Sequence, residues 1–153
     1  MIVGHGIDLM STKRIAAAIE RFGDRFIRRV YTDYERETVT LRTGARDRPP
    51  AGSRQFSGRQ ARFGEPSWSG RAHQMFTAFW AVKEAAMKAL GTGNRRGVAF
   101  RDIEVRHQRT GKPYLVLHGR SAEHARRLGV ARIAVSMTHL DDLSAASVIF
   151  ESD

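Results

Sequence analysis

The sequence predicts an α+β fold, in which a small, largely antiparallel sheet packs against helices. Segments with alternating apolar residues open the chain and return in its last third, and several segments with helical spacing lie between them. The two kinds of segment do not alternate one by one, as a doubly wound α/β sheet would require. A length of 153 residues favours one domain, 1–153, with a real hydrophobic core.

The first third of the chain predicts a strand followed by helices. Residues 1–9 have strand character, and Ser11 or Thr12 then suits the N-cap of a helix that ends at Gly23. Residues 26–30 suggest a short helical piece. The sequence TDYE at 32–35 matches a capping box, so another helix is expected to begin there.

The rest of the chain contains one irregular stretch, a long helix and a strand-rich end. Residues 44–72 are rich in Gly, Ser, Arg and Pro and lack any period, which predicts a surface insertion in the single domain. Residues 73–90 have the composition of a strong helix, and Gly91 is placed to end it. The expected later elements are strands near 100–108 and 114–119 joined by a turn at 111–113, a helix from Ser121, and strands at 132–139 and 143–151.

Charge narrows the class of partner. The chain has 26 Lys and Arg against 16 Asp and Glu, a net charge of +10, which favours nucleic acid, nucleotide phosphates or an acidic protein; solubility alone is the other reading. No nucleic-acid-reading motif is recognisable, so nucleic acid is not expected. Neither a long apolar run nor a signal-peptide pattern occurs, so we expect no membrane partner and a cytoplasmic location. The absence of Cys excludes disulfides and thiolate metal sites.

The opening strand contains GHGIDLM, in which two glycines and a carboxylate interrupt the apolar pattern. Because side chains alternate along a strand, Gly4, Gly6 and Asp8 share one face, and His5 and Ile7 lie on the other. A face of bare backbone lets another group approach closely. That group is either a neighbouring helix, with Asp8 starting the next turn, or a ligand that meets Asp8.

The long helix combines an apolar stripe with charged residues. Lys83 lies at helical spacing from Trp80 and Met87, Glu84 borders the stripe, and Lys88 follows Glu84 by one turn. Lys83 could extend its ammonium from the core edge into water, Glu84 and Lys88 could form an ordinary ion pair, or the three could form a site.

Two further features are weak by themselves. Gly91-Thr92-Gly93 follows a helix, whereas phosphate-binding glycine loops usually precede one, so it indicates a helix cap. His139 ends a probable strand, where a surface role is common.

Together, these segments resemble a known family. GHGIDLMSTKRI resembles the G-x-G-x-D…R-I opening of the holo-acyl-carrier-protein synthases, which are 4′-phosphopantetheinyl transferases. FWAVKEAAMKALGTG is similar to their W/F-A-x-K-E-A-x-x-K-A-x-G-T-G helix, and FRDIEV, GKPYLVLHG and VSMTH…SAASVI are similar to three later blocks in the same order. The resemblance covers residues 1–36 and 75–150, and it implies a 4′-phosphopantetheinyl transferase-like fold.

The resemblance implies magnesium-dependent transfer of 4′-phosphopantetheine from coenzyme A to a serine of apo acyl carrier protein. The products are the holo carrier and adenosine 3′,5′-bisphosphate, in fatty acid biosynthesis and lipid metabolism. Asp8 and Glu84 would hold Mg²⁺, and Asp8, Glu84 and Lys83 would be the catalytic residues. The proton of the carrier serine would go to Glu84 or to a metal-organised water.

The resemblance also implies binding residues and an assembly. Coenzyme A would contact Lys83, Lys88, Gly91 and His139. The carrier would contact Lys13, Arg14 and Arg21. A homotrimer with sites between subunits is expected, and the glycine face of the first strand becomes the surface that phosphate and metal approach.

Three features depart from the family pattern. Phe79 stands where Arg is common, His5 stands where an apolar residue is usual, and the 44–72 insertion is longer than the usual link. These departures keep an alternative function open: a non-catalytic protein that binds coenzyme A or a polyanion such as nucleic acid. The residues do not distinguish among carriers of fatty-acid, polyketide and peptide assembly.

Overall fold

A computed structural model describes residues 1–44, 70–93 and 97–153 of the chain. Its elements, in chain order, are β1 (Ile2–Ser11), α1 (Thr12–Phe22), α2 (Asp24–Val30), α3 (Asp33–Thr43), α4 (Gly70–Ala89), the short 3₁₀ helix η2 (Phe100–Asp102), β2 (Ile103–His107), β3 (Pro113–Leu117), α5 (Gly119–Arg127), β4 (Arg132–His139) and β5 (Leu143–Glu151).

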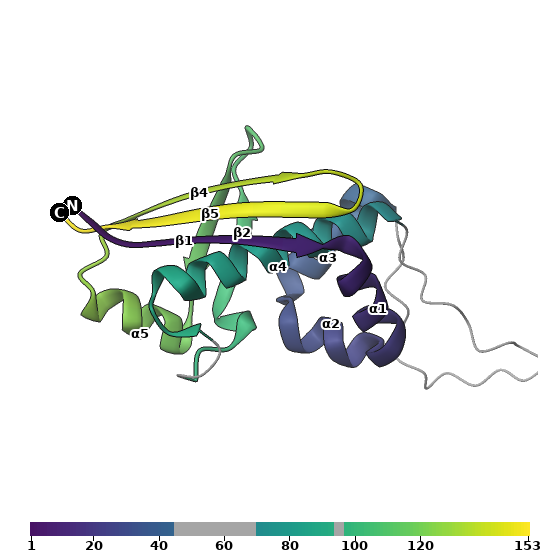
Figure 1. The fold of residues 1–153 in the computed structure, drawn as a ribbon, viewed down its shortest axis with the longest axis horizontal. Coiled ribbons are helices and arrows are strands. Elements are labelled where there is room, and N and C mark those ends of the chain that lie inside the picture. Colours follow the sequence, from purple (N-terminus) through teal and green to yellow (C-terminus); the bar gives the residue numbers. More distant parts are fainter. Residues whose placement is uncertain (45–69, 94–96) are drawn as a thin grey trace, which may run out of the picture.

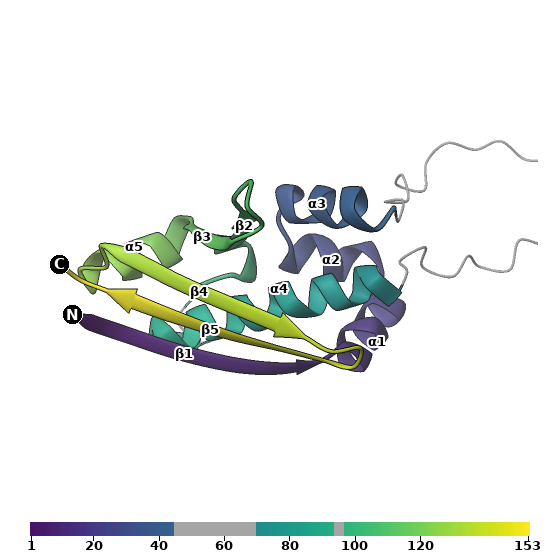
Figure 2. The same cartoon turned by 90° about the horizontal axis from the view of Figure 1, so that it is seen from above.

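The long helix α4 is the centre of the molecule. On one side it lies along an antiparallel sheet with strand order β1–β5–β4 (Figures 1 and 2). On the other side it packs against α1 and α3, and its Trp80 stacks on Phe26 of α2; the hairpin β2–β3 closes a third side. The two chain ends lie together, where the N-terminal ammonium donates to the Ser152 carbonyl at 2.9 Å. The arrangement matches the helix-and-sheet layers expected from the sequence.

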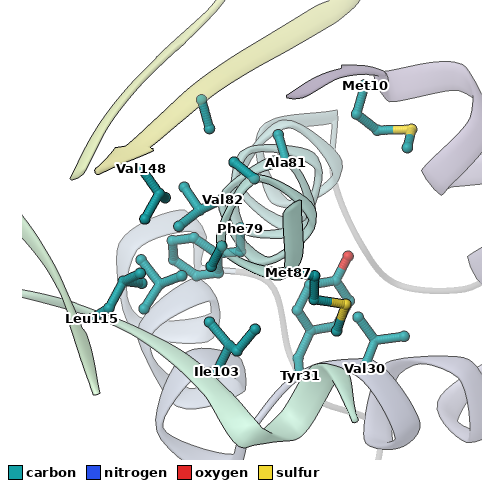
Figure 3. Packing of buried hydrophobic residues seen from close by; sticks show 14 of the residues in the cluster. Met10, Val30, Tyr31, Phe79, Ala81, Val82, Met87, Ile103, Leu115 and Val148 are labelled. Carbon is teal, nitrogen blue, oxygen red and sulfur yellow. The ribbon is translucent and has the colours of Figure 1, made fainter. Parts of the chain in front are cut away.

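Buried side chains gather around α4 from every neighbouring element. Figure 3 shows Val148 of β5, Leu115 of β3 and Val30 of α2 on different sides of the helix. The sheet-facing side of α4 is lined by small residues, and Ala81 and Ala85 are fully buried there. Small side chains let the helix approach the strands closely.

Glycines in β1 make this approach possible. A Cβ at Gly4 would overlap the carbonyl oxygen of Ala89, and one at Gly6 would overlap the carbonyl oxygen of Ala85. The group that approaches the glycine face is therefore α4. The interpretation of this face as the approach surface for phosphate and metal is wrong, because the helix backbone already fills it.

Replacing Gly6 with alanine is expected to lower the free energy of unfolding by about 1–3 kcal/mol or more, because the added methyl forces β1 away from α4. Urea unfolding measures the change. Gly70→Ala is the matched control, because a Cβ there meets no atom within 4 Å and alanine favours a helix. Equal losses in the two variants would contradict the close-contact explanation.

Element boundaries differ from the expected ones in several places. Strand β1 continues to Ser11 instead of ending at residue 9, and the strand expected near 100–108 begins at Ile103, after the 3₁₀ helix η2. Helix α4 begins at Gly70, inside the expected 44–72 insertion, and residues 45–69 of that insertion lie outside the described residues. Ser121 does not cap a helix; α5 begins two residues earlier, and the Ser121 hydroxyl donates to the carbonyls of Asp102 (2.6 Å) and His118 (2.8 Å). The single-domain organisation stays a prediction. Within the described ranges, no helix has the length and apolar character needed to cross a membrane.

Candidate active site

Asp8 follows the two glycines on the inner face of β1 and meets α4 at its edge. The Lys88 ammonium donates to Asp8 Oδ1 at 2.7 Å and to the Ile7 carbonyl at 2.9 Å. The Asp8 side chain is 12% exposed and that of Lys88 is 50% exposed. The second carboxylate oxygen, Asp8 Oδ2, is buried and has no hydrogen-bond partner among the described residues. A buried charged oxygen without a donor is costly, so it marks a place where a further cation or donor fits.

Glu84 lies one helical turn before Lys88, so the two side chains leave α4 on the same flank. Glu84 is only partly buried. Within the described ranges, this flank therefore carries the carboxylates of Asp8 and Glu84 and the ammonium of Lys88, drawn from β1 and α4. The structure thus brings Asp8 and Lys88 into contact, as the sequence predicted for one site, and places Glu84 beside Lys88.

The donor set suits Mg²⁺. This ion prefers oxygen ligands, keeps several waters and is commonly held by one or two carboxylates together with substrate phosphates. Across the described part of the chain, no group of three or more His, Asp or Glu side chains is placed to hold a metal. Asp8 and Glu84 with substrate oxygens would form the kind of open site that this ion accepts, and no donor among the described residues contacts Asp8 Oδ2.

Lys83 is a correction to the predicted site. Its side chain is fully buried, and its ammonium contacts Glu35 Oε2 at 2.9 Å, the Phe100 carbonyl at 2.9 Å and the Ile103 carbonyl at 2.5 Å. An ammonium has three N–H donors, and all three are used here. Neither phosphate nor solvent can reach it, so Lys83 is a structural residue and not a catalytic or phosphate-binding one.

The Lys83–Glu35 pair joins three parts of the fold. Glu35 also accepts hydrogen bonds from the backbone N–H groups of Thr32 (2.8 Å) and Val105 (2.7 Å). Burial raises the pKa of Glu35, against the opposing effects of Lys83 and the backbone donors. Burial likewise lowers the pKa of Lys83, although the Glu35 charge opposes this. The pair fixes α4 against α3 and β2.

His139 lies away from the Asp8 flank. It ends β4, which β5 separates from β1, and it faces a cavity of about 400 Å³ on the other side of α4. Arg42 of α3, Arg71 of α4 and His107 of β2 also line this cavity. Sequence reasoning missed these three residues, because they come from separate elements and share no local pattern. Within one chain, His139 therefore lines a cavity to which Asp8 does not belong.

Phe79 forms part of the wall of the same cavity. Its ring packs against His107 with 5.9 Å between centroids. Burial and the nearby charge of Arg42 lower the pKa of His107, and its Nδ1 atom is buried without a partner among the described residues. His107 therefore favours its neutral form, whereas Arg42 and Arg71 are positively charged.

Gly91 caps α4 as expected. Its φ of 68° is left-handed, and its N–H donates to the Lys88 carbonyl at 3.0 Å. The glycine ends the helix within one turn of Lys88. Contact between Gly91 and coenzyme A stays a prediction.

Comparison with known proteins decides the family. The model of the 4′-phosphopantetheinyl transferase superfamily matches residues 4–146. The chain belongs to this superfamily. Holo-[acyl-carrier-protein] synthase of Solibacter usitatus (strain Ellin6076) is 41% identical over 152 residues, which cover 99% of this chain and 100% of the relative.

Solved structures confirm the predicted fold class of this phosphopantetheinyl transferase. A holo-(acyl-carrier-protein) synthase from Bacillus anthracis str. Ames in complex with CoA (3′,5′-ADP) matches with a TM-score of 0.68 at 28% identity, covering 100% of this chain and 99% of that one. The synthase from Neisseria meningitidis matches with a TM-score of 0.71 at 29% identity, covering 99% and 100%. The prediction of an enzyme is confirmed with the family.

The transferase exposes the predicted cations of α1. Lys13, Arg14 and Arg21 all face solvent, and Arg21 lies over the Phe22 ring at 5.0 Å. A groove of about 420 Å³ begins at Phe22, where α1 ends. It is lined by aromatic, apolar and cationic side chains: Phe22, Arg25, Phe26, Arg29, Val30, Trp80 and Phe100. The sequence did not indicate this groove, because its walls come from α1, α2, α4 and η2.

Proposed function

We propose that this enzyme transfers 4′-phosphopantetheine from coenzyme A to a serine of apo acyl carrier protein in a magnesium-dependent reaction, releasing adenosine 3′,5′-bisphosphate. The observation that carries the proposal is the Asp8 carboxylate, held through Oδ1 by Lys88 while Oδ2 is buried without a partner in the described part of the chain. The names of the relatives support the carrier, and the coenzyme bound by the Bacillus anthracis protein supports the donor.

Asp8 and Glu84 would hold the magnesium ion, which when bound neutralises charge on the pyrophosphate. Lys88 has a double role. Two of its three N–H donors hold Asp8 and the Ile7 carbonyl, and the third, which has no acceptor among the described residues, would bind a phosphate oxygen. Phosphoryl transfer depends on positioning and charge neutralisation more than on a protein nucleophile, which the carrier serine supplies. Glu84, or a water held beside it, accepts the serine proton.

The site is completed between copies of the chain. The cavity with His139, Arg42 and Arg71 is suited to anionic groups of coenzyme A, but it opens on the other side of α4 from Asp8. A homotrimer in which this cavity meets the Asp8 flank of a neighbour would bring the two halves together, as the family resemblance implies.

The carrier would dock on α1 and the aromatic groove. Acidic carriers are attracted to a chain of net charge +10, and the exposed Lys13, Arg14 and Arg21 place part of that charge beside an apolar groove. An acidic surface that ends in an apolar side chain would fit both features.

Arg14→Glu is expected to raise the KM for the carrier at least about tenfold while the KM for coenzyme A changes little, because one docking cation becomes an anion. Steady-state kinetics with each substrate varied in turn measure both constants. Arg127→Glu, the same charge reversal on α5, is the control and should leave both constants near wild type. Equal effects of Arg14→Glu on both substrates would argue against docking at α1.

Mass spectrometry tests the function directly. The protein is incubated with coenzyme A, Mg²⁺ and apo carriers of fatty-acid, polyketide and peptide assembly, with a chelator as the control. One carrier should gain the mass of phosphopantetheine, and the chelator should prevent the gain. No gain on any carrier would overturn the proposal. The cytoplasmic location stays a prediction.

A further inference from the structure

The outer face of the three-stranded sheet carries no Lys, Arg, Asp or Glu over three rows of residues. Cross-strand pairing places nine side chains on it, three from each strand: His5, Ile7, Leu9, Ala134, Ser136, Thr138, Ala145, Ser147 and Ile149. Ile7 and Leu9 are each 64% exposed. A shallow hollow of about 160 Å³ lies between Ile7, Ser136 and Ala145. Exposed Ile and Leu side chains beside small uncharged residues make this face a candidate interaction surface.

The chemistry of this face fits a second copy of the same chain. An acidic partner such as a carrier would find no Lys or Arg there, although the chain has 26 of them. Copies arranged about a symmetry axis bring like residues near one another, so charges in the middle of the face would repel. Small uncharged residues avoid this cost. This step rests on the homotrimer proposed above.

His5 is the titratable residue among the nine. Its Nε2 atom lies 3.3 Å from Ser147 Oγ, and Ile149 is directly opposite on β5. Within the described residues, this face carries charges at its end, where Arg132 of β4 pairs with Glu151 of β5 at 3.6 Å.

Two further charged groups near β1, the N-terminal ammonium and Lys88, have hydrogen-bond partners of their own. The N-terminal ammonium donates to the Ser152 carbonyl, and Lys88 of α4 pairs with Asp8 on the inner face. No carboxylate of the described residues forms an ion pair with His5.

We propose that His5 lies inside the contact between copies and makes their association depend on pH. Histidine ordinarily gains a proton between about pH 8 and pH 5. A neutral imidazole can be buried against Ile149 with its hydrogen bond to Ser147, whereas an imidazolium must lose its hydration without an anionic partner. Association therefore favours the neutral form. The contact is strongest at neutral pH and weakens as the pH falls.

Sedimentation equilibrium of wild type, His5→Leu and His5→Gln at pH 7.5, 6.5 and 5.5 tests the proposal. The wild-type dissociation constant should rise at least about tenfold from pH 7.5 to 5.5. Both His5 variants should remain associated at pH 5.5, and circular dichroism confirms that each sample is folded. His118→Gln removes a histidine remote from this face and should keep the wild-type pH dependence.

Two outcomes would overturn the proposal: unchanged pH dependence in both His5 variants, or a wild-type chain that does not associate at pH 7.5. Transfer activity measured at pH 7.5 on the same samples separates the two proposals. A chain that transfers phosphopantetheine without associating would contradict the role of His5 and the homotrimer. It would leave the proposed transferase function intact. A chain that associates in a pH-dependent way but modifies no carrier would support the role of His5 and contradict the proposed transferase function.

Discussion

Replacing Asp8 with asparagine is expected to lower the rate of phosphopantetheine transfer at least about 100-fold, the scale on which one group that stabilises developing charge contributes. The amide has the shape of the carboxylate but lacks the charge that Lys88 and a magnesium ion require. Fold stability should change by no more than about 1 kcal/mol, because the Asp8–Lys88 pair is half exposed on the lysine side. Steady-state transfer rates and urea unfolding measure the two effects.

Glu123→Gln is the matched control for this change. It removes an exposed carboxylate from α5, where its partner is Arg127 at 3.8 Å. Its transfer rate and its magnesium dependence should equal those of wild type. The magnesium concentration needed for half-maximal rate should rise in Asp8→Asn only. A wild-type rate in Asp8→Asn would place the reaction elsewhere in the molecule.

The secondary structure could be predicted because its signals are local. The capping box at 32–35 needs only four residues, and it forms as expected: the Thr32 N–H donates to Glu35 Oε2, and the Glu35 N–H donates to Thr32 Oγ1. Strand β5 likewise follows its alternating pattern from end to end, and β4 follows its own as far as Thr138. In each case, the residues that form the element also supply the interactions that define it, so no distant segment is needed to predict it.

The packing of β1 could not be predicted from its pattern. Alternation separates Gly4, Gly6 and Asp8 from Ile7 and Leu9, and the apolar face is the ordinary choice for the core. The structure buries the glycine face, because the alanine-lined side of α4 needs backbone contact, and it leaves Ile7 and Leu9 exposed. This choice depends on a helix that is about 80 residues away in sequence.

In the candidate site, too, local patterns could be predicted from the sequence, whereas contacts between distant segments could not. The resemblance placed Asp8, Glu84 and Lys88 together, and the structure joins Asp8 to Lys88. Helical spacing correctly put Lys83 in line with buried residues, but it could not indicate the buried carboxylate of Glu35 as its partner. The carboxylate comes from another helix, and its own sequence signal is fully explained by the capping box.

Lys83→Met is expected to lower the free energy of unfolding by about 3–5 kcal/mol, the cost of removing one partner from a buried ion pair. Glu35 would be left as a buried carboxylate without its counter-ion, and the carbonyls of Phe100 and Ile103 would lose their donor. Urea unfolding at pH 7.5 measures the loss. Lys112→Met, in the exposed turn between β2 and β3, is the matched control and should cost little.

The double variant Lys83→Met with Glu35→Gln separates lost charge balance from lost packing. Glutamine removes the buried charge but has one acceptor oxygen, so it can keep only one of the two hydrogen bonds that the carboxylate accepts from the N–H groups of Thr32 and Val105. Because the uncompensated charge is the larger cost, the double variant should be more stable than Lys83→Met alone. The pH dependence has a definite sign. Burial raises the pKa of Glu35, and loss of Lys83 raises it further, so folding favours the protonated carboxyl most in Lys83→Met. Its deficit relative to wild type should be largest near pH 7.5 and should shrink toward pH 5, whereas the double variant should show no such change. Equal deficits for the single and double variants at every pH would mean that Lys83 acts through packing and not through its charge.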